Sequence, residues 1–537
     1  MSKETNWQKF SDQLLRYSEP DLWIDLSQMR MPKDIINTEK ESIERALHEV
    51  SNIESGEKVN TDEDKDKGGR CVGHYWLRNP DLAPEGLGTS IRRKIAEIKA
   101  FSSGIHKGEI LAPNKGKFRH LLVIGVGGSA LGPQLAIDAL TGHDAPMSIH
   151  FFDNTDPDGI DRVLNGLGET LDSTLSLVIS KSGGTKETRN GMLEAQAAYE
   201  KAGLDFGGHA IAVTGEESKL DNYAKKNEWI GIFPMENWVG GRTSISSVVG
   251  LLPMALMGID IDEFLEGAAA VDAKTRPPEI NNNASLLMAL AWHVAGNGTG
   301  EKAMVILPYK DRLGLLSKYL QQLVMESLGK EHDRENKIVH QGLTVYGNKG
   351  STDQHAYVQQ LRDGLDNFFT TFIEVRETRT KESIEVDPGF TTGDYLEGFL
   401  RGTRSALFEA GRDSMTISIP RLDAFHLGSL IALYERAVSY YAALININAY
   451  HQPGVEAGKK AATQFLEILS KIENHLTVHV EENINPEKLS REIGAAPEDC
   501  FHALHHLAAN RKNITALIGS EPKDDLFTLK KEEPETG

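Results

Sequence analysis

The chain contains only two cysteines among its 537 residues, Cys71 and Cys500, and they lack the spacing of a metal-ligand motif. This scarcity argues against a disulfide framework and is typical of a reducing compartment. No run of 18 apolar residues occurs, and the opening residues MSKETNWQKF contain no apolar signal segment. We therefore expect a cytoplasmic protein that has no membrane partner.

Positive charge is also scarce. The chain carries 58 Lys and Arg against 78 Asp and Glu, a formal net charge of −20, and no stretch interleaves basic residues with aromatics. This balance argues against nucleic acid and anionic membranes as partners. An acidic protein that binds an anion must therefore concentrate positive potential at the binding site. The length exceeds what one hydrophobic core holds, so we expect at least two domains.

The most informative stretch is Leu175–Asn190, which reads LSLVISKSGGTKETRN. A short, partly β-branched apolar run ends at Ser180 and predicts a buried parallel strand, and helical spacing begins after Thr185. Lys181, Ser182 and two glycines lie between them. The N–H groups at a helix N-terminus and three hydroxyls can bind an anion. The spacing differs from a nucleotide P-loop, which favours a compact group such as a sugar phosphate. An ordinary turn capped by Ser182 and Thr185 is the alternative.

Strands and helices alternate in two successive parts of the chain, which predicts an α/β fold with two doubly wound parallel sheets in tandem. The expected strands are 121–126, 149–153, 175–180, 210–214 and 229–233, then 304–307, 343–346, 368–375 and 415–419. The expected regions are a helical N-terminal region 1–115, α/β domains 116–275 and 300–423, C-terminal helices 424–520 and a tail 521–537. Residues 1–54 are expected to be helical, the charged stretch TDEDKDKGG to be a surface loop or insertion, and the last residues KKEEPETG to be disordered.

A second glycine-rich turn follows the strand expected at 121–126, in LLVIGVGGSALG. Gly125, Gly127 and Ala130 match the G-x-G-x-x-[GA] dinucleotide fingerprint, a weak signal alone. Gly128 and Ser129 would equally suit a small anion or a sugar hydroxyl. Both turns would lie at the carboxyl edge of one sheet, where they could hold one small ligand between them.

Glu326 is a candidate general base. The segment 312–330 has helical spacing, which places Glu326 on the same face as Tyr319 and Gln322. A carboxylate on a largely apolar face is either paired for structural reasons or positioned to take a proton.

Three polar turns carry further candidates. Arg242 follows two glycines in WVGGRTS and could hold a carboxylate, a phosphate or an oxyanion, or could be a surface residue of a capping turn. His355 falls in the first turns of a helix expected after GSTDQ, and a lone His is more often structural. Gln452, Glu456 and Lys459 lie in the turn-to-helix segment YHQPGVEAGKK. His502 and His505 share a helical face, but no third metal ligand is evident.

In this order, six stretches resemble the phosphoglucose isomerase family: GVGGSALG, SKSGGTKET, WVGGRTS, QQLVMES, GSTDQHAYVQQ and QPGVEAGK. They span residues 125–459, and the earlier segments GEKVN and HYWLRNP are also similar. The glycine pair 183–184 and Ser182 differ from the animal enzymes and look like a bacterial or plastid-type variant. The resemblance implies two sugar-isomerase domains with extra helices, a homodimer with shared active sites, a sugar-phosphate substrate, and neither cofactor nor metal.

The resemblance also implies a role for each matching residue. The substrate and its phosphate would be bound by Gly128, Ser129, Ser180, Lys181, Ser182, Thr185, Gln322 and Gln452. Glu326 would move a proton between C1 and C2 through a cis-enediol, and Arg242 would stabilise the enediolate charge. His355, from the partner subunit, and Lys459 would open and close the sugar ring. A carboxylate and a guanidinium suit this proton transfer, and His suits a proton shuttle near neutral pH.

Three alternatives remain at this point. An NAD-dependent dehydrogenase would explain the fingerprint glycines, but not the second anion-binding turn or Glu326. A non-catalytic sugar-phosphate sensor would not need Glu326, Arg242, His355 and Lys459 together. A bifunctional isomerase that also accepts mannose 6-phosphate is compatible with every motif.

Overall fold

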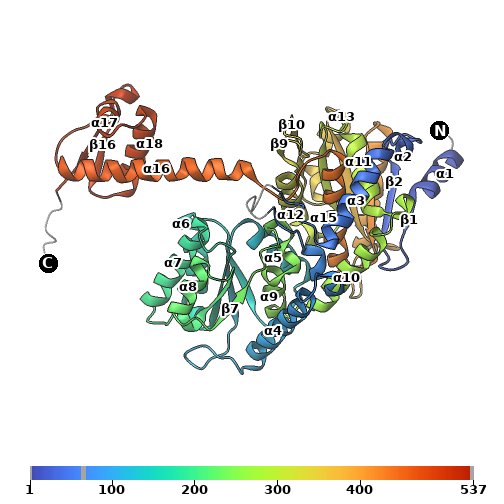
Figure 1. Cartoon of the computed structure of the whole chain (residues 1–537), viewed down its shortest axis with the longest axis horizontal. Helices are drawn as coiled ribbons and strands as arrows, with labels where there is room; N and C mark the ends of the chain where they lie inside the picture. Colours follow the sequence, from blue (N-terminus) through green and yellow to red (C-terminus); the bar gives the residue numbers. More distant parts are fainter. Residues whose placement is uncertain (1–2, 62–67, 532–537) are drawn as a thin grey trace. The chain divides into compact units, whose positions relative to one another are not determined.

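The structure is a computed structural model that describes residues 3–61 and 68–531 (Figure 1). The chain divides into two compact units, Met1–His451 and Gln452–Gly537. Most of the charged stretch TDEDKDKGG and of the tail KKEEPETG, for which we expect a surface loop and disorder, lies outside the described residues. Within those residues, no helix is long and apolar enough to cross a membrane.

The first unit contains a parallel sheet with the strand order β4-β3-β5-β6-β7. Its strands are β3 (His120–Ile124), β4 (Ser148–Phe152), β5 (Thr174–Ser180), β6 (Ala210–Thr214) and β7 (Gly231–Pro234). The five predicted strands are confirmed, with small shifts at their ends. The chain runs from β3 outward to β4 and then returns to β5 on the other side of β3. Ligands of such sheets bind at the carboxyl ends of the two strands where the winding reverses, here β3 and β5.

Helices cover both faces of this sheet, as a doubly wound fold requires (Figure 1). One face packs on α6, α7 and α8, and the other on α5 and α9, with α4 behind α9. The bounds are α4 (Leu87–Lys107), α5 (Leu131–Leu140), α6 (Pro157–Leu167), α7 (Lys186–Lys201), α8 (Lys219–Lys226) and α9 (Val248–Leu256). Every residue of β5 is buried, which explains its nearly continuous apolar sequence.

A second sheet has the strand order β1-β2-β15-β12-β8-β11. Its strands are β1 (Leu14–Arg16), β2 (Trp23–Gln28), β8 (Ala303–Pro308), β11 (Val345–Tyr346), β12 (Phe368–Val375) and β15 (Ser414–Ile419). Four of them run parallel and confirm the predicted strands. The prediction that residues 1–54 are helical is wrong for β1 and β2. These strands pair antiparallel along the β15 edge, a tertiary contact that overrides the weak local pattern.

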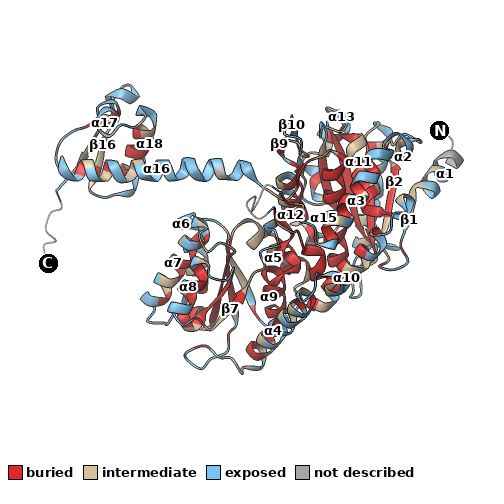
Figure 2. Ribbon diagram, viewed as in Figure 1, coloured by how far each residue is buried: buried red, intermediate tan, exposed pale blue. Residues whose placement is uncertain are grey.

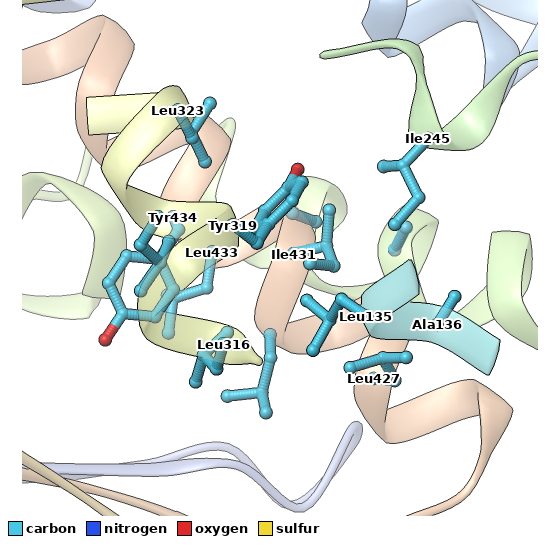
Figure 3. Close-up of a cluster of buried hydrophobic side chains, with 14 of the residues drawn as sticks. Leu135, Ala136, Ile245, Leu316, Tyr319, Leu323, Leu427, Ile431, Leu433 and Tyr434 are labelled. Atoms are coloured by element: carbon cyan, nitrogen blue, oxygen red, sulfur yellow. The ribbon is translucent and has the colours of Figure 1, made fainter. Parts of the chain in front are cut away.

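Both sheets share one hydrophobic core, formed largely by α10 (Ile261–Thr275), α11 (Ala284–Ala295) and α15 (Ala424–Leu444). Helix α15 is buried along almost its whole length, although the expected boundaries place it with the C-terminal helices (Figure 2). It crosses α10 backbone to backbone, because a Cβ at Gly428 would collide with the carbonyl oxygen of Phe264. Figure 3 shows side chains of this core from the part of the unit around the first sheet and from the later part that includes α12 (Leu316–Leu320) and α15. The labelled residues are Leu135, Ala136, Ile245, Leu316, Tyr319, Leu323, Leu427, Ile431, Leu433 and Tyr434.

Shorter elements complete the first unit. The helices are α1 (Lys3–Gln13), α2 (Ile35–Thr38), α3 (Lys40–Ser55), α12 (Leu316–Leu320), α13 (Val358–Asp363) and α14 (Thr392–Glu409). Two antiparallel pairs are β9 (Lys330–His332) with β10 (Ile338–Gln341), and β13 (Glu385–Asp387) with β14 (Phe390–Thr391).

The second unit is a small helical body with its own core. It consists of α16 (Pro453–Val478), α17 (Pro486–Ile493), α18 (Pro497–Asn510) and the hairpin β16 (Ile514–Leu517) with β17 (Leu526–Leu529). Its core includes Ile472, Leu476, Leu504 and Phe527, so α16 contributes its C-terminal half. The helices confirm the prediction for this part of the chain, but the hairpin was not predicted.

Candidate active site

The two predicted anion-binding turns lie at the point where the winding of the first sheet reverses. The 3₁₀ turn η4 (Gly127–Ser129) follows β3, and the loop 181–185 joins β5 to α7. In the loop, the Ser180 hydroxyl contacts that of Thr185 at 3.4 Å, and the Gly184 N–H donates to Ser182 Oγ at 3.2 Å. Thr185 occupies the N-cap position of α7, but its side chain makes no capping hydrogen bond. The capping alternative is therefore wrong for Thr185.

Gly183 lets this loop approach the next helix. Its φ is +62°, in the left-handed region, and a Cβ there would collide with the backbone N of Leu220 on α8. A Cβ at Gly184 would meet nothing closer than Ser182 Oγ at 3.7 Å. The two glycines that resemble the bacterial variant therefore have different roles, and only Gly183 is required by the backbone.

A pocket of about 470 Å³ opens beside the same loop, on the side of α7 and α8. It is lined by Val178, Ser180, Gly183, Gly184, Thr185, Lys186, Thr188, Arg189, Met192, Leu193, Lys219, Leu220 and Tyr223. Three cationic residues among them, Lys186, Arg189 and Lys219, concentrate positive charge next to the hydroxyls of a chain whose net charge is −20. Sequence reasoning missed these three. The helical spacing of Lys186 and Arg189 after Thr185 could have indicated two of them, whereas Lys219 comes from another helix.

The turn after β3 packs directly on the turn that carries Arg242. A Cβ at Gly128 would collide with the carbonyl oxygen of Gly241. The Ser244 hydroxyl bridges the two turns by contacting the carbonyl oxygens of Gly128 at 3.2 Å and Gly241 at 2.7 Å. A Cβ at Gly127 would lie 3.1 Å from Nε2 of Gln322. Gly127 and Gly128 therefore bring three predicted site segments together, which explains these two glycines without a dinucleotide.

Lys181 connects the anion-binding loop to this arrangement. Its Nζ donates to the carbonyl oxygens of Asn237 at 2.8 Å and Val239 at 2.7 Å. The lysine thus joins the loop after β5 to the segment that leads into Arg242.

Arg242 and Glu326 form the centre of the site. Nε of Arg242 lies 3.4 Å from Oε2 of Glu326, and the side chains are 8% and 25% exposed. The guanidinium also donates from Nη1 to Ser327 Oγ at 3.1 Å and to the Ala449 carbonyl, and from Nη2 to the His451 carbonyl at 3.2 Å. Buried contacts on several sides fix the cation, whereas the carboxylate stays accessible. Arg242 is therefore not the surface residue of the alternative interpretation.

Glu326 ends a π-helical turn. The sequence predicts one regular helix over residues 312–330, but the structure has α12 followed by the π-helical turn η10 (Gln321–Glu326). A π turn accommodates an additional residue. Tyr319 is buried, whereas Glu326 is partly exposed. The prediction of one regular helix over residues 312–330 is therefore wrong at this turn, because a π-helical turn does not follow the 3.6-residue period.

The remaining predicted residues, His355, Gln452 and Lys459, come from other segments of the chain. His355 is exposed at the end of the 3₁₀ turn η11 (Thr352–His355), not within the first turns of a regular helix. Asp353 anchors that turn by accepting from the backbone N–H groups of Asn348 and Lys349. Gln452 and Lys459 belong to the second unit, at the start of α16.

Comparisons with known proteins show the family of the chain. The family model "Phosphoglucose isomerase" matches residues 25–391 and 399–482. The glucose-6-phosphate isomerase of Thermosynechococcus vestitus is 55% identical over 517 residues, 95% of this chain and 96% of that protein. The glucose-6-phosphate isomerase of Citrifermentans bemidjiense is 53% identical over 514 residues, which cover 95% of this chain and 96% of that protein. A glucose-6-phosphate isomerase crystal structure from Chlamydia trachomatis has a TM-score of 0.78 at 26% identity and covers 87% of this chain and 92% of its own. The chain therefore belongs to the phosphoglucose isomerase family.

Proposed function

We propose that the chain interconverts glucose 6-phosphate and fructose 6-phosphate. The observation that carries this proposal is the Arg242–Glu326 pair, with a buried cation and an accessible carboxylate. The pair lies close to the turn after β3, because Gly241, next to Arg242, packs on Gly128. Curated relatives at 53–55% identity carry the name glucose-6-phosphate isomerase, and they extend over nearly the whole chain.

The sugar phosphate would bind between the two turns. The hydroxyls of Ser180, Ser182 and Thr185 and the N-terminus of α7 would hold the phosphate, with Lys181 in the same loop. Gly128 and Ser129 would line the opposite side of the bound sugar phosphate, and Gln322 would contact the sugar. Gln452 would add a contact from the start of α16.

In the open-chain sugar, the Glu326 carboxylate would take the C2 proton of the aldose. The electron pair of that C–H bond forms the C1–C2 double bond, and negative charge develops on O1. Arg242 would stabilise this charge through its fixed guanidinium. Glu326 would then return the proton to C1 while the proton of the O2 hydroxyl moves to O1 and the carbonyl forms at C2. The electron pair stays within the sugar, so the transfer balances without an external reductant.

Ring opening needs a proton moved between the ring oxygen and the anomeric hydroxyl, which is on C1 in glucose 6-phosphate and on C2 in fructose 6-phosphate. We assign it to His355 and Lys459, with His355 reaching the site from a second copy of the chain in a homodimer. The exposure of His355 supports this assignment. We also propose a cytoplasmic location, which the free cysteines Cys71 and Cys500 support.

A coupled assay tests the function directly. Purified protein with fructose 6-phosphate and EDTA should form glucose 6-phosphate. Absence of turnover, combined with binding of the sugar phosphate in calorimetry, would overturn the proposal and favour a sugar-phosphate sensor.

A further inference from the structure

Arg242 is held by a segment that has no regular secondary structure. Its two terminal nitrogens donate to the carbonyl oxygens of Ala449 and His451, which follow α15 in an irregular stretch. The carbonyl between them, that of Tyr450, accepts instead from Nδ2 of Asn60 at 3.4 Å. Successive carbonyls thus alternate between Arg242 and Asn60. No helix or strand fixes this stretch, so its side-chain contacts must do so.

A closed set of hydrogen bonds fixes the orientation of Asn60. The backbone N–H of Tyr450 donates to Oδ1 of Asn448 at 2.9 Å. A backbone N–H can only donate, so Nδ2 of Asn448 must face away, where it donates to Oδ1 of Asn60 at 3.0 Å. Nδ2 of Asn60 is then the group that faces the Tyr450 carbonyl. The two asparagines are 3% and 4% exposed, so water does not compete for these bonds.

The Tyr450 side chain attaches the same stretch to α15. Its hydroxyl contacts Ser439 Oγ at 2.9 Å, and the buried Tyr75 hydroxyl contacts the same oxygen at 2.9 Å. Asn60 itself is held by paired backbone hydrogen bonds with Arg70. The stretch is therefore fastened to α15 through the tyrosine, and its carbonyls are oriented by Asn60.

We propose that Asn60 is a positioning residue for catalysis: by holding the Tyr450 carbonyl, it directs the Ala449 and His451 carbonyls onto Arg242 and so fixes the guanidinium beside Glu326. Asn60 touches neither member of that pair and acts through residues 449–451. The inference rests on the role proposed above for Arg242. It adds a residue 390 positions from Tyr450 in sequence to the determinants of the reaction.

The first test is Asn60→Ala in the full chain. Loss of the amide frees the Tyr450 carbonyl, and a guanidinium displaced from its position should lower kcat for fructose 6-phosphate roughly 10- to 100-fold. KM should stay within about twofold, since the phosphate loop is untouched. Asn448→Asp keeps the acceptor for the Tyr450 N–H but removes the donor to Asn60, so it should reproduce the effect and serves if Asn60→Ala does not fold.

Asn283→Ala is the matched control. Asn283 is also fully buried, donates to the Thr275 carbonyl and the Tyr440 hydroxyl, and accepts from the Leu286 N–H. Its removal should lower the melting temperature but leave kcat per folded molecule, measured beside circular dichroism, within about twofold. If Asn60→Ala behaves in the same way, Asn60 is only structural and the inference fails.

The decisive test combines Asn60→Ala with Arg242→Ala. If Asn60 acts through Arg242, the double variant should have the kcat of Arg242→Ala alone, within about twofold. If the fold-losses in kcat of the two single variants multiply in the double variant, the inference is overturned. An Arg242→Ala enzyme with wild-type kcat would instead contradict the mechanism proposed for the isomerase. A deficient Arg242→Ala beside a normal Asn60→Ala would remove only the inference about Asn60.

Discussion

The anion-binding loop and the Arg242–Glu326 pair are built in different ways. The loop is local: its hydroxyls and the N-terminus of α7 lie within a few residues of Ser180. The pair is assembled over long distances in sequence, since Arg242 is held by Ser327, Ala449 and His451, which are 85, 207 and 209 residues away. Substrate affinity should therefore depend on short-range features, and the chemical step on the packing of the whole first unit.

The largest effect is expected from Glu326→Gln. The amide keeps the size of the side chain but cannot take a proton, so kcat should fall about 1,000-fold or more. Met325→Ala is the control, because Met325 is the exposed neighbour in the same π-helical turn, and its kcat should stay within about twofold. Comparable losses in the two variants would indicate damage to the turn and not loss of a base.

His355→Ala should slow turnover of cyclic fructose 6-phosphate about 100-fold and that of an open-chain analogue much less. If His355 serves the site of a second copy, mixing this variant with Glu326→Gln under subunit exchange should restore activity, because one site of each mixed dimer is complete. Recovery should approach about a quarter of the wild-type rate. Equal losses on both substrates would argue against ring opening, and absence of recovery would place His355 in its own subunit's site.

The double variant Ser182→Ala with Thr185→Ala tests the anion-binding loop. Loss of two hydroxyl donors should weaken fructose 6-phosphate binding roughly tenfold for each hydroxyl, with little change in kcat at saturation. Calorimetry measures the affinity directly. Unchanged binding would place the phosphate elsewhere, and a fall confined to kcat would remove the distinction between the two regions.

The smallest effect should separate the two loop glycines. Gly183→Ala must keep φ near +62° and meets Leu220, so it should lower the free energy of unfolding by about 1–2 kcal/mol and raise KM. A Cβ at residue 184 has space, so Gly184→Ala should leave the free energy of unfolding and KM unchanged within experimental error. Thermal melting and steady-state kinetics compare the two variants. Equal tolerance would show that the loop can shift away from α8.

The same contrast explains what could be predicted from sequence. The strands of the first sheet and the loop after β5 follow from local patterns, and β6 and β12 have the predicted bounds. The strands β1 and β2 could not be predicted, because β2 pairs with β15, almost 400 residues away, and β1 pairs in turn with β2. The hairpin β16–β17 likewise depends on the small core of the second unit.

The site shows the same limit. Each residue of the Arg242–Glu326 pair could be singled out from its motif, but not the π-helical turn that leaves Glu326 accessible. Nor could a local pattern indicate that Asn60 orients the stretch that holds Arg242, because that contact joins residues 390 positions apart. The contribution of Lys219 to the pocket beside the loop could not be predicted either, because Lys219 lies on a separate helix.

Hydrogen exchange at C2 tests the central claim most directly. Wild-type protein incubated with glucose 6-phosphate in deuterated water should introduce deuterium at C2, because Glu326 takes that proton and partly exchanges it with solvent. Glu326→Gln should introduce none over the same time while binding fructose 6-phosphate within about tenfold of wild type. Deuterium incorporation by Glu326→Gln at the wild-type rate would contradict the assignment of Glu326 as the base.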